Sequence, residues 1–175
     1  MKFARFQLDP EPIDKDNEVW IYFGIASYYA QVLEKGLIQF IIFLKLIGLS
    51  EIKPEITEQI FGIFKKQTMG QLLCEVRKKT NIPIHIDELL SKSLEKRNFL
   101  AHRFFDHYAL DHLNKEGRAK MVDELQQIIA LFKHVDQELN KIFLTLIEHF
   151  GITNETIEAE YQSLLNEYDD EYKNI

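Results

Sequence analysis

The sequence predicts an all-α protein: an up-and-down helical bundle of four main helices with short additional helices. Two long segments repeat apolar residues every three or four positions, the spacing that puts side chains on one face of an α-helix. Seven glycines and four prolines in 175 residues are few for an all-β protein, which needs more of both in its turns. The 46% of hydrophobic residues is enough to form a core.

The first main helix is expected from about Asn17 to Ile47, after an N-terminal arm of residues 1–16. Acidic residues at its start meet the positive end of the helix dipole, and Gly48 and Pro54 end the pattern. Its apolar face is expected to contain Leu33, Leu37, Phe40, Ile41, Leu44 and Ile47.

Two short helices are expected at Glu55–Lys66 and Met69–Lys79. Asn81 and Pro83 then break the chain before a helix from Asp87 to about Phe105. The next stretch, DHYALDHLNKEG, is compatible with a turn or with a frayed continuation of that helix.

The clearest periodicity predicts a long helix from about Lys115 to Phe150, followed by Gly151 at the C-cap position. One side of this helix is expected to carry Val122, Leu125, Ile129, Phe132, Leu139, Ile142, Phe143, Leu146, Ile147 and Phe150. A last helix is expected at about Asn154–Tyr168, within an acidic C-terminal segment of residues 152–175. Without a convincing linker or repeat, residues 1–175 are interpreted as one domain.

Charge and cysteine content narrow the classes of function. A formal net charge of −7 argues against a nucleic-acid coat protein, so any RNA contact must be local. The single cysteine, Cys74, excludes an internal disulfide and fits a reducing compartment. The most apolar stretch, residues 36–48, is too short to span a bilayer and contains Gln39 and Lys45. We therefore expect a soluble, cytoplasmic protein with no membrane partner.

One charged residue interrupts the apolar stripe of the helix at 87–105. On a helical wheel, Arg97 falls among leucines, while Asn98 and His102 lie one turn apart on the shoulder of that face. Burying an unpaired guanidinium is very costly. Three explanations stay open: Arg97 pairs with a carboxylate from another helix, its head reaches solvent at the edge, or the stripe faces a cleft or a partner.

The stretch RNFLAH at 97–102 resembles the R-x-x-x-x-H signature, with a polar residue after the arginine, of the HEPN (higher eukaryotes and prokaryotes nucleotide-binding) domains. YYAQVLEKGLIQF (28–40) and TMGQLL (68–73) are similar to helices of the family, so that the likeness covers roughly residues 20–145. The resemblance implies an all-α bundle and a homodimer whose two motifs line one cleft. It also implies a metal-independent endoribonuclease, often a toxin or an antiviral effector.

The resemblance assigns catalytic roles to Arg97, Asn98 and His102. Imidazole is suited to move protons near neutral pH, and a guanidinium can stabilise the extra negative charge on a phosphorane. Residues with a weaker claim to contact RNA phosphates, or else to form a solvated face, are Lys92, Lys96 and Arg103. No cofactor and no metal are expected, because the His- and Asp-rich run from His102 to His112 lacks a recognised ligand spacing.

Some toxins of the family have a tyrosine two residues after the histidine, which a partner nucleotidyltransferase modifies. Phe104 stands there in this chain, which weakens but does not remove the expectation of a nucleotidyltransferase-type antitoxin. The main alternative is a non-catalytic dimeric adaptor or nucleotide-binding module in which Arg97 is an interface ion-pair residue.

Overall fold

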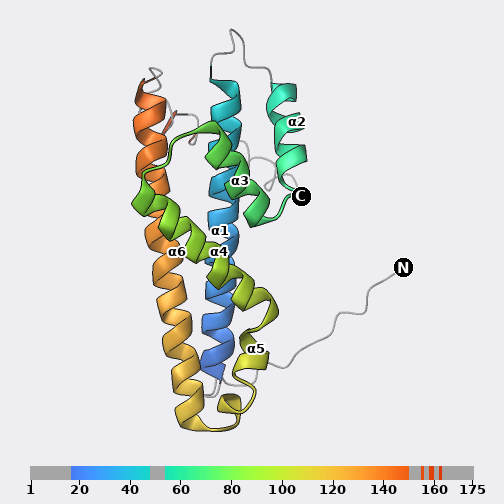
Figure 1. The fold of residues 1–175 in the computed structure, drawn as a ribbon, viewed down its shortest axis with the longest axis vertical. Coiled ribbons are helices and arrows are strands. Elements are labelled where there is room, and N and C mark those ends of the chain that lie inside the picture. The colour runs from blue at the N-terminus through green and yellow to red at the C-terminus, as the bar shows by residue number, and fades with distance from the viewer. Residues whose placement is uncertain (1–16, 48–53, 150–154, 156–157, 160–161, 163–175) are drawn as a thin grey trace, which may run out of the picture. The chain divides into compact units, whose positions relative to one another are not determined.

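The computed structural model describes residues 17–47 and 54–149 and four positions nearer the C-terminus, 155, 158, 159 and 162. The described part contains helices and no strand, which confirms the all-α fold (Figure 1). In chain order the helices are α1 (Glu18–Leu46), α2 (Pro54–Phe64), α3 (Met69–Lys79), α4 (Ile84–His102), α5 (Phe104–His107), the 3-10 helix η2 (Asp111–Leu113) and α6 (Lys115–His149).

Internal contacts divide the chain into two units, residues 1–136 and 137–175, and the division falls within α6. The first unit holds α1 to α5, the first part of α6 and every candidate site residue. In the second unit α6 continues to His149, and the four described positions beyond it are helical and exposed. The N-terminal arm and the remainder of the expected acidic helix lie outside the described residues.

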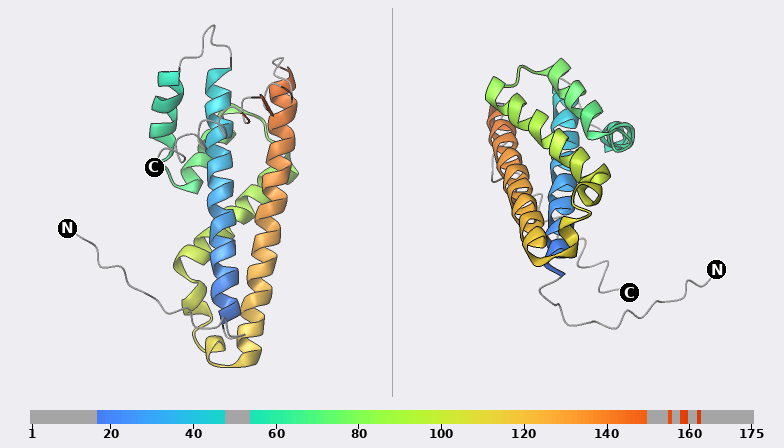
Figure 2. Two further views of the ribbon diagram at one scale, coloured as in Figure 1. Left: turned by 180° about the vertical axis from the view of Figure 1, so that it is seen from behind. Right: turned by 60° about the horizontal axis from the view of Figure 1, so that its bottom comes forward.

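Within the first unit, α1 packs against α2, α3 and α4. The first part of α6 also contacts α1, since Lys133 Nζ lies 5.2 Å from the ring centroid of Tyr29. Two views show α4 crossing α1 obliquely (Figures 1 and 2), and Lys96 of α4 is paired with Glu124 in the first part of α6. The helix that carries the candidate site therefore packs against both α1 and the first part of α6.

The core of the first unit forms where the apolar faces of its helices meet. Four of the six residues expected on the buried face of α1 are buried, whereas Leu44 and Ile47 are half-buried. The other helices contribute chiefly Met69, Leu72, Leu73, Val76, Ile86, Leu90, Leu100, Met121, Leu125, Ile128, Phe132 and Val135. Burying such side chains is the main favourable term in folding.

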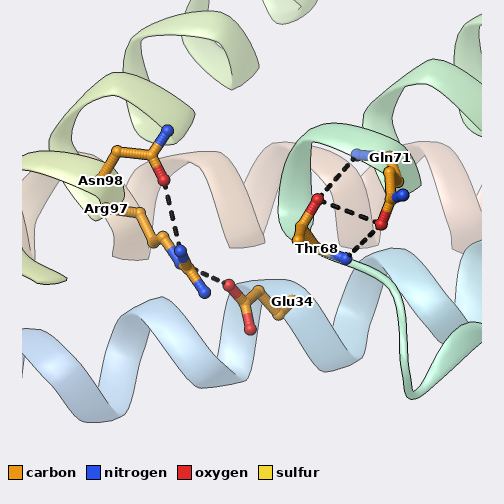
Figure 3. A network of polar contacts seen from close by, with 5 residues as sticks. All are labelled: Glu34, Thr68, Gln71, Arg97 and Asn98. Atoms are coloured by element: carbon orange, nitrogen blue, oxygen red, sulfur yellow. Dashed lines mark hydrogen bonds and ion pairs between the residues drawn. The ribbon is translucent and has the colours of Figure 1, made fainter.

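Local hydrogen bonds define where helices begin. The Thr68 hydroxyl accepts a bond from the Gln71 N–H at 3.4 Å, and the Gln71 side chain accepts one from the Thr68 N–H at 2.9 Å (Figure 3). This capping box satisfies two backbone donors at the start of α3. At the start of α6, the Asn114 side chain accepts a bond from the Gly117 N–H at 2.8 Å.

The end of α4 differs from the expectation of one helix to Phe105. Arg103 leaves helical geometry at φ −137°, and α5 begins at the next residue. Phe104 is 1% exposed and packs against a cluster of rings that includes Phe23 and Phe99. The stretch 106–117, which the sequence left open, continues through α5 and η2 to the cap of α6.

Candidate functional site

Arg97 is joined to α1 by an ion pair. Its Nε lies 2.7 Å from Oε1 of Glu34, and the two side chains retain 27% and 24% of their exposure (Figure 3). Of the three explanations left open by the sequence, the structure therefore shows pairing with a carboxylate from another helix. The pair is within one chain and partly solvated, so that neither charge is isolated in the core.

Asn98 fixes the other side of the guanidinium. Its Oδ1 accepts a hydrogen bond from Nη1 of Arg97 at 3.2 Å. Nη2 has no hydrogen bond to any residue that the structure describes. The guanidinium is thus held by its Nε and Nη1 edges, and it retains donors that can bind an additional anion.

His102 occupies the next turn of α4 after Asn98, as the sequence predicted. Its side chain is exposed and makes no hydrogen bond with the described residues. Because Arg97 bonds to Asn98, its head group is drawn toward the shoulder of α4 that also carries the imidazole. The structure thus brings Arg97 and Asn98 into contact and leaves His102 one turn away, open to solvent.

Small side chains leave space beside the arginine. A cavity of about 160 Å³ between α1 and α4 is lined by Ser27, Ala30, Glu34, Arg97 and Ala101, among others. Ala101, one turn after Arg97 on α4, is exposed. The arginine therefore borders an opening rather than a closed core.

The three residues with a weaker claim to contact RNA do not lie together beside Arg97. Lys92 is exposed on α4. Lys96 is bound to α6 through an ion pair with Glu124, with Nζ and Oε1 2.6 Å apart. Arg103 lies at a separate groove between α4, α5 and α6.

Glu34 is a site residue that no pattern in the sequence singles out. An arginine in an apolar stripe calls for a carboxylate, but the chain offers 28 acidic residues and local periodicity does not select among them. The available signal was that Glu34 directly follows Leu33 within a strongly apolar stretch of helix.

Comparison with family models, with curated proteins and with solved structures finds no match to this chain. None of the helices that the structure describes is long and apolar enough to cross a membrane. Within the same residues, no group of three or more His, Cys, Asp or Glu side chains is arranged to hold a metal ion.

Proposed function

We propose that this chain is a metal-independent endoribonuclease of the HEPN type that acts as a homodimer in the cytoplasm. The observation that supports this proposal is the combination, on α4, of an oriented guanidinium and an exposed imidazole with no hydrogen-bond partner among the described residues. A purely structural ion pair would explain why an arginine stands at position 97. It would not explain why Asn98 and His102 lie beside it on the same helix.

The proposed reaction is attack of an RNA 2′-hydroxyl on the adjacent phosphorus. The 2′-oxygen bonds to phosphorus and the bond to the 5′-oxygen breaks, leaving a 2′,3′-cyclic phosphate and a 5′-hydroxyl. One proton leaves the 2′-hydroxyl and one is delivered to the 5′-oxygen, a task for which imidazole is suited. Arg97 would bind the phosphorane oxygens through the donors that Glu34 and Asn98 leave open.

Two proton transfers favour a dimer. One His102 can act as base or as acid in a given step, so that a second copy would supply the other imidazole. Exposed apolar side chains on α1 are available for such an interface: Trp20, Ile21, Ile25 and Tyr28. Trp20 also stacks on Phe105 with ring centroids 4.9 Å apart, so this apolar surface extends to α5, next to the end of α4.

The test is to incubate the pure protein with RNA in EDTA and to analyse the ends of the products. We expect cleavage with 2′,3′-cyclic phosphate ends, and a loss of about 10²–10⁴-fold in rate for His102→Ala. His85→Ala is the matched control, because His85 is also exposed on α4. Absence of cleavage, or equal rates for His102→Ala and wild type, would refute the proposal.

A toxin or antiviral role follows from the same proposal, with a nucleotidyltransferase-type antitoxin as a candidate partner. Phe104 offers no hydroxyl for modification and is 1% exposed. Such a partner would therefore have to act at another residue or by binding alone.

The second candidate function is a non-catalytic dimeric adaptor or nucleotide-binding module. The 2.7 Å pair between Arg97 and Glu34 supports a structural role for this arginine, within one chain rather than at an interface between two copies. The net charge of −7 also disfavours binding of a polyanion. This candidate predicts that Arg97→Ala lowers stability while the wild type leaves RNA intact.

A further inference from the structure

A second cavity among the described residues is separate from the opening beside Arg97. It is a groove of about 700 Å³ where α4, α5 and α6 meet, hereafter the α4–α6 groove. Its lining includes three aromatic side chains and several charged ones. The function proposed above makes no use of it.

The aromatic side chains of the groove form a connected set. The Phe99 ring lies 5.6 Å from the His107 ring and 6.5 Å from the Tyr108 ring, with both pairs close to perpendicular. His107 and Tyr108 are 4.7 Å apart, again edge to face. In each pair the edge of one ring meets the face of the other, so that no two of these rings are stacked face to face. A ring face that its neighbours leave uncovered can pack against an unstacked nucleobase.

The charges of the groove fall into a paired group and an unpaired group. Lys96 is paired with Glu124 at 2.6 Å, and its Nζ lies 5.6 Å from the centroid of Phe99. The other three charged side chains make no ion pair or hydrogen bond with any described residue: Glu95, Arg103 and Asp106. Two unpaired carboxylates beside one guanidinium disfavour a bare phosphate, but they can accept N–H bonds from a neutral ligand.

We propose that the α4–α6 groove binds one unstacked nucleobase of single-stranded RNA, with guanine preferred. Guanine presents two adjacent N–H donors, N1–H and the 2-amino group, which match the two oxygens of a carboxylate. Adenine and cytosine each place a ring-nitrogen acceptor beside their amino group, and uracil has one N–H donor between two carbonyls. Only guanine offers a bidentate contact without an acceptor facing the carboxylate.

The position of the groove connects it to the proposed reaction. Glu95 and His102 are seven residues apart on α4, close to two full turns, so they lie along one side of the helix. A base in the groove would direct its flanking phosphate toward the shoulder that carries His102. The choice of RNA as the polymer rests on the proposed function, whereas binding of the base itself does not.

The test uses nucleosides, which contain no phosphodiester bond and are therefore not substrates of the proposed reaction. Isothermal titration of the full-length wild type with guanosine, inosine, adenosine, cytidine and uridine is expected to rank guanosine first. Inosine lacks the 2-amino group and is expected to bind about tenfold more weakly. Guanosine 5′-monophosphate is expected to bind about as well as guanosine, because the base provides the contacts.

Two variants locate the contact. Glu95→Gln and Asp106→Asn each remove one unpaired carboxylate, and at least one is expected to weaken guanosine binding about tenfold. Glu88→Gln is the matched control: Glu88 is exposed on α4, two turns before Glu95, and does not line the groove. Circular dichroism verifies the fold of each variant, and having two variants protects the test if one fails to fold.

The inference is overturned if guanosine does not bind, if all nucleosides bind equally, or if both carboxylate variants bind like wild type. It is also overturned if inorganic phosphate or arginine, but not guanosine, occupies the groove. Binding of guanosine without any RNA cleavage would refute the proposed function and leave the groove assignment standing. Cleavage of RNA without guanosine binding would refute the groove assignment alone.

Discussion

Removing the Arg97 side chain distinguishes a catalytic arginine from a structural one. In the structural interpretation, Arg97→Ala costs the ion pair with Glu34 and the hydrogen bond to Asn98. Both side chains are about three-quarters buried, with 27% and 24% exposure, so the cost lies between those of exposed and fully buried pairs. Exposed pairs contribute about 0.2–1 kcal/mol, and breaking a buried pair costs about 3–5 kcal/mol. We therefore expect Arg97→Ala to lower the free energy of unfolding by about 1–2 kcal/mol.

That loss is too small to explain a large loss of activity. A domain that begins with about 5 kcal/mol of stability keeps about 3 kcal/mol, which leaves about 99% of the molecules folded. For a chain of this length, the expected decrease in Tm is about 2–8 °C. If Arg97 stabilises the phosphorane, however, the cleavage rate at 25 °C should fall about 10²–10³-fold.

The assay combines thermal melts with RNA cleavage for Arg97→Ala, Glu34→Gln and the double variant. Arg77→Ala is the matched control, because Arg77 of α3 forms an ion pair of similar length with Asp87 of α4, with Nε and Oδ1 2.6 Å apart. Glu34→Gln leaves the guanidinium charge in place and removes its anchor, so we expect a loss of about tenfold in rate. Equal cleavage by Arg97→Ala and Arg77→Ala would refute the catalytic interpretation and favour the adaptor.

Three further changes test the fold and the groove. Ser93→Ala should raise stability by about 1 kcal/mol in chemical denaturation, since the buried hydroxyl of Ser93 has no hydrogen-bond partner among the described residues; a loss of stability would contradict this. Gly117→Ala should lower stability by about 1–3 kcal/mol, because a Cβ there would overlap the backbone of Asp111; an unchanged melt would contradict that close approach. Burial raises the pKa of Tyr108 above its ordinary value of 10.0, and the negative charge of Glu124 raises this pKa further. The folded state therefore holds this proton more tightly than the unfolded state and loses stability as the pH rises above 10, and Tyr108→Phe should reduce that alkaline loss in melts.

Local signals in the sequence located the helices well. The bounds of α3 agree with the expected Met69–Lys79, because a capping residue and a basic last turn bracket that segment. At two positions of α6 the buried residue is the one before the residue that the sequence predicted. Met121 and Ile128 are buried, whereas Val122 and Ile129 are half-buried. Adjacent apolar residues make such a choice ambiguous, since the neighbouring helices determine which of the two is covered.

The contacts between residues of different helices could not be predicted from the sequence. Periodicity put Arg97 in an apolar stripe and left a carboxylate partner as one of three explanations. Glu34 is distant from Arg97 in sequence, and the pair forms only because α1 packs against α4. The α4–α6 groove is formed by residues from Glu95 to Glu124, several of which look like ordinary surface positions in isolation. Its aromatic set depends on the break at Arg103, which the helical pattern did not reveal.

Two consecutive residues anchor α4 to different helices, and this decides where His102 points. Arg97 is bound to Glu34 on α1 at 2.7 Å, and Lys96 is bound to Glu124 on α6 at 2.6 Å. Successive residues of a helix are about 100° apart, so these anchors fix the rotation of α4 about its axis. Asn98 and His102 then lie about 100° and 140° from Arg97, on the shoulder of α4 where the His102 side chain is exposed. The imidazole therefore faces away from the core of the first unit, and a catalytic cleft around it requires a second surface, which a second copy of the chain would provide.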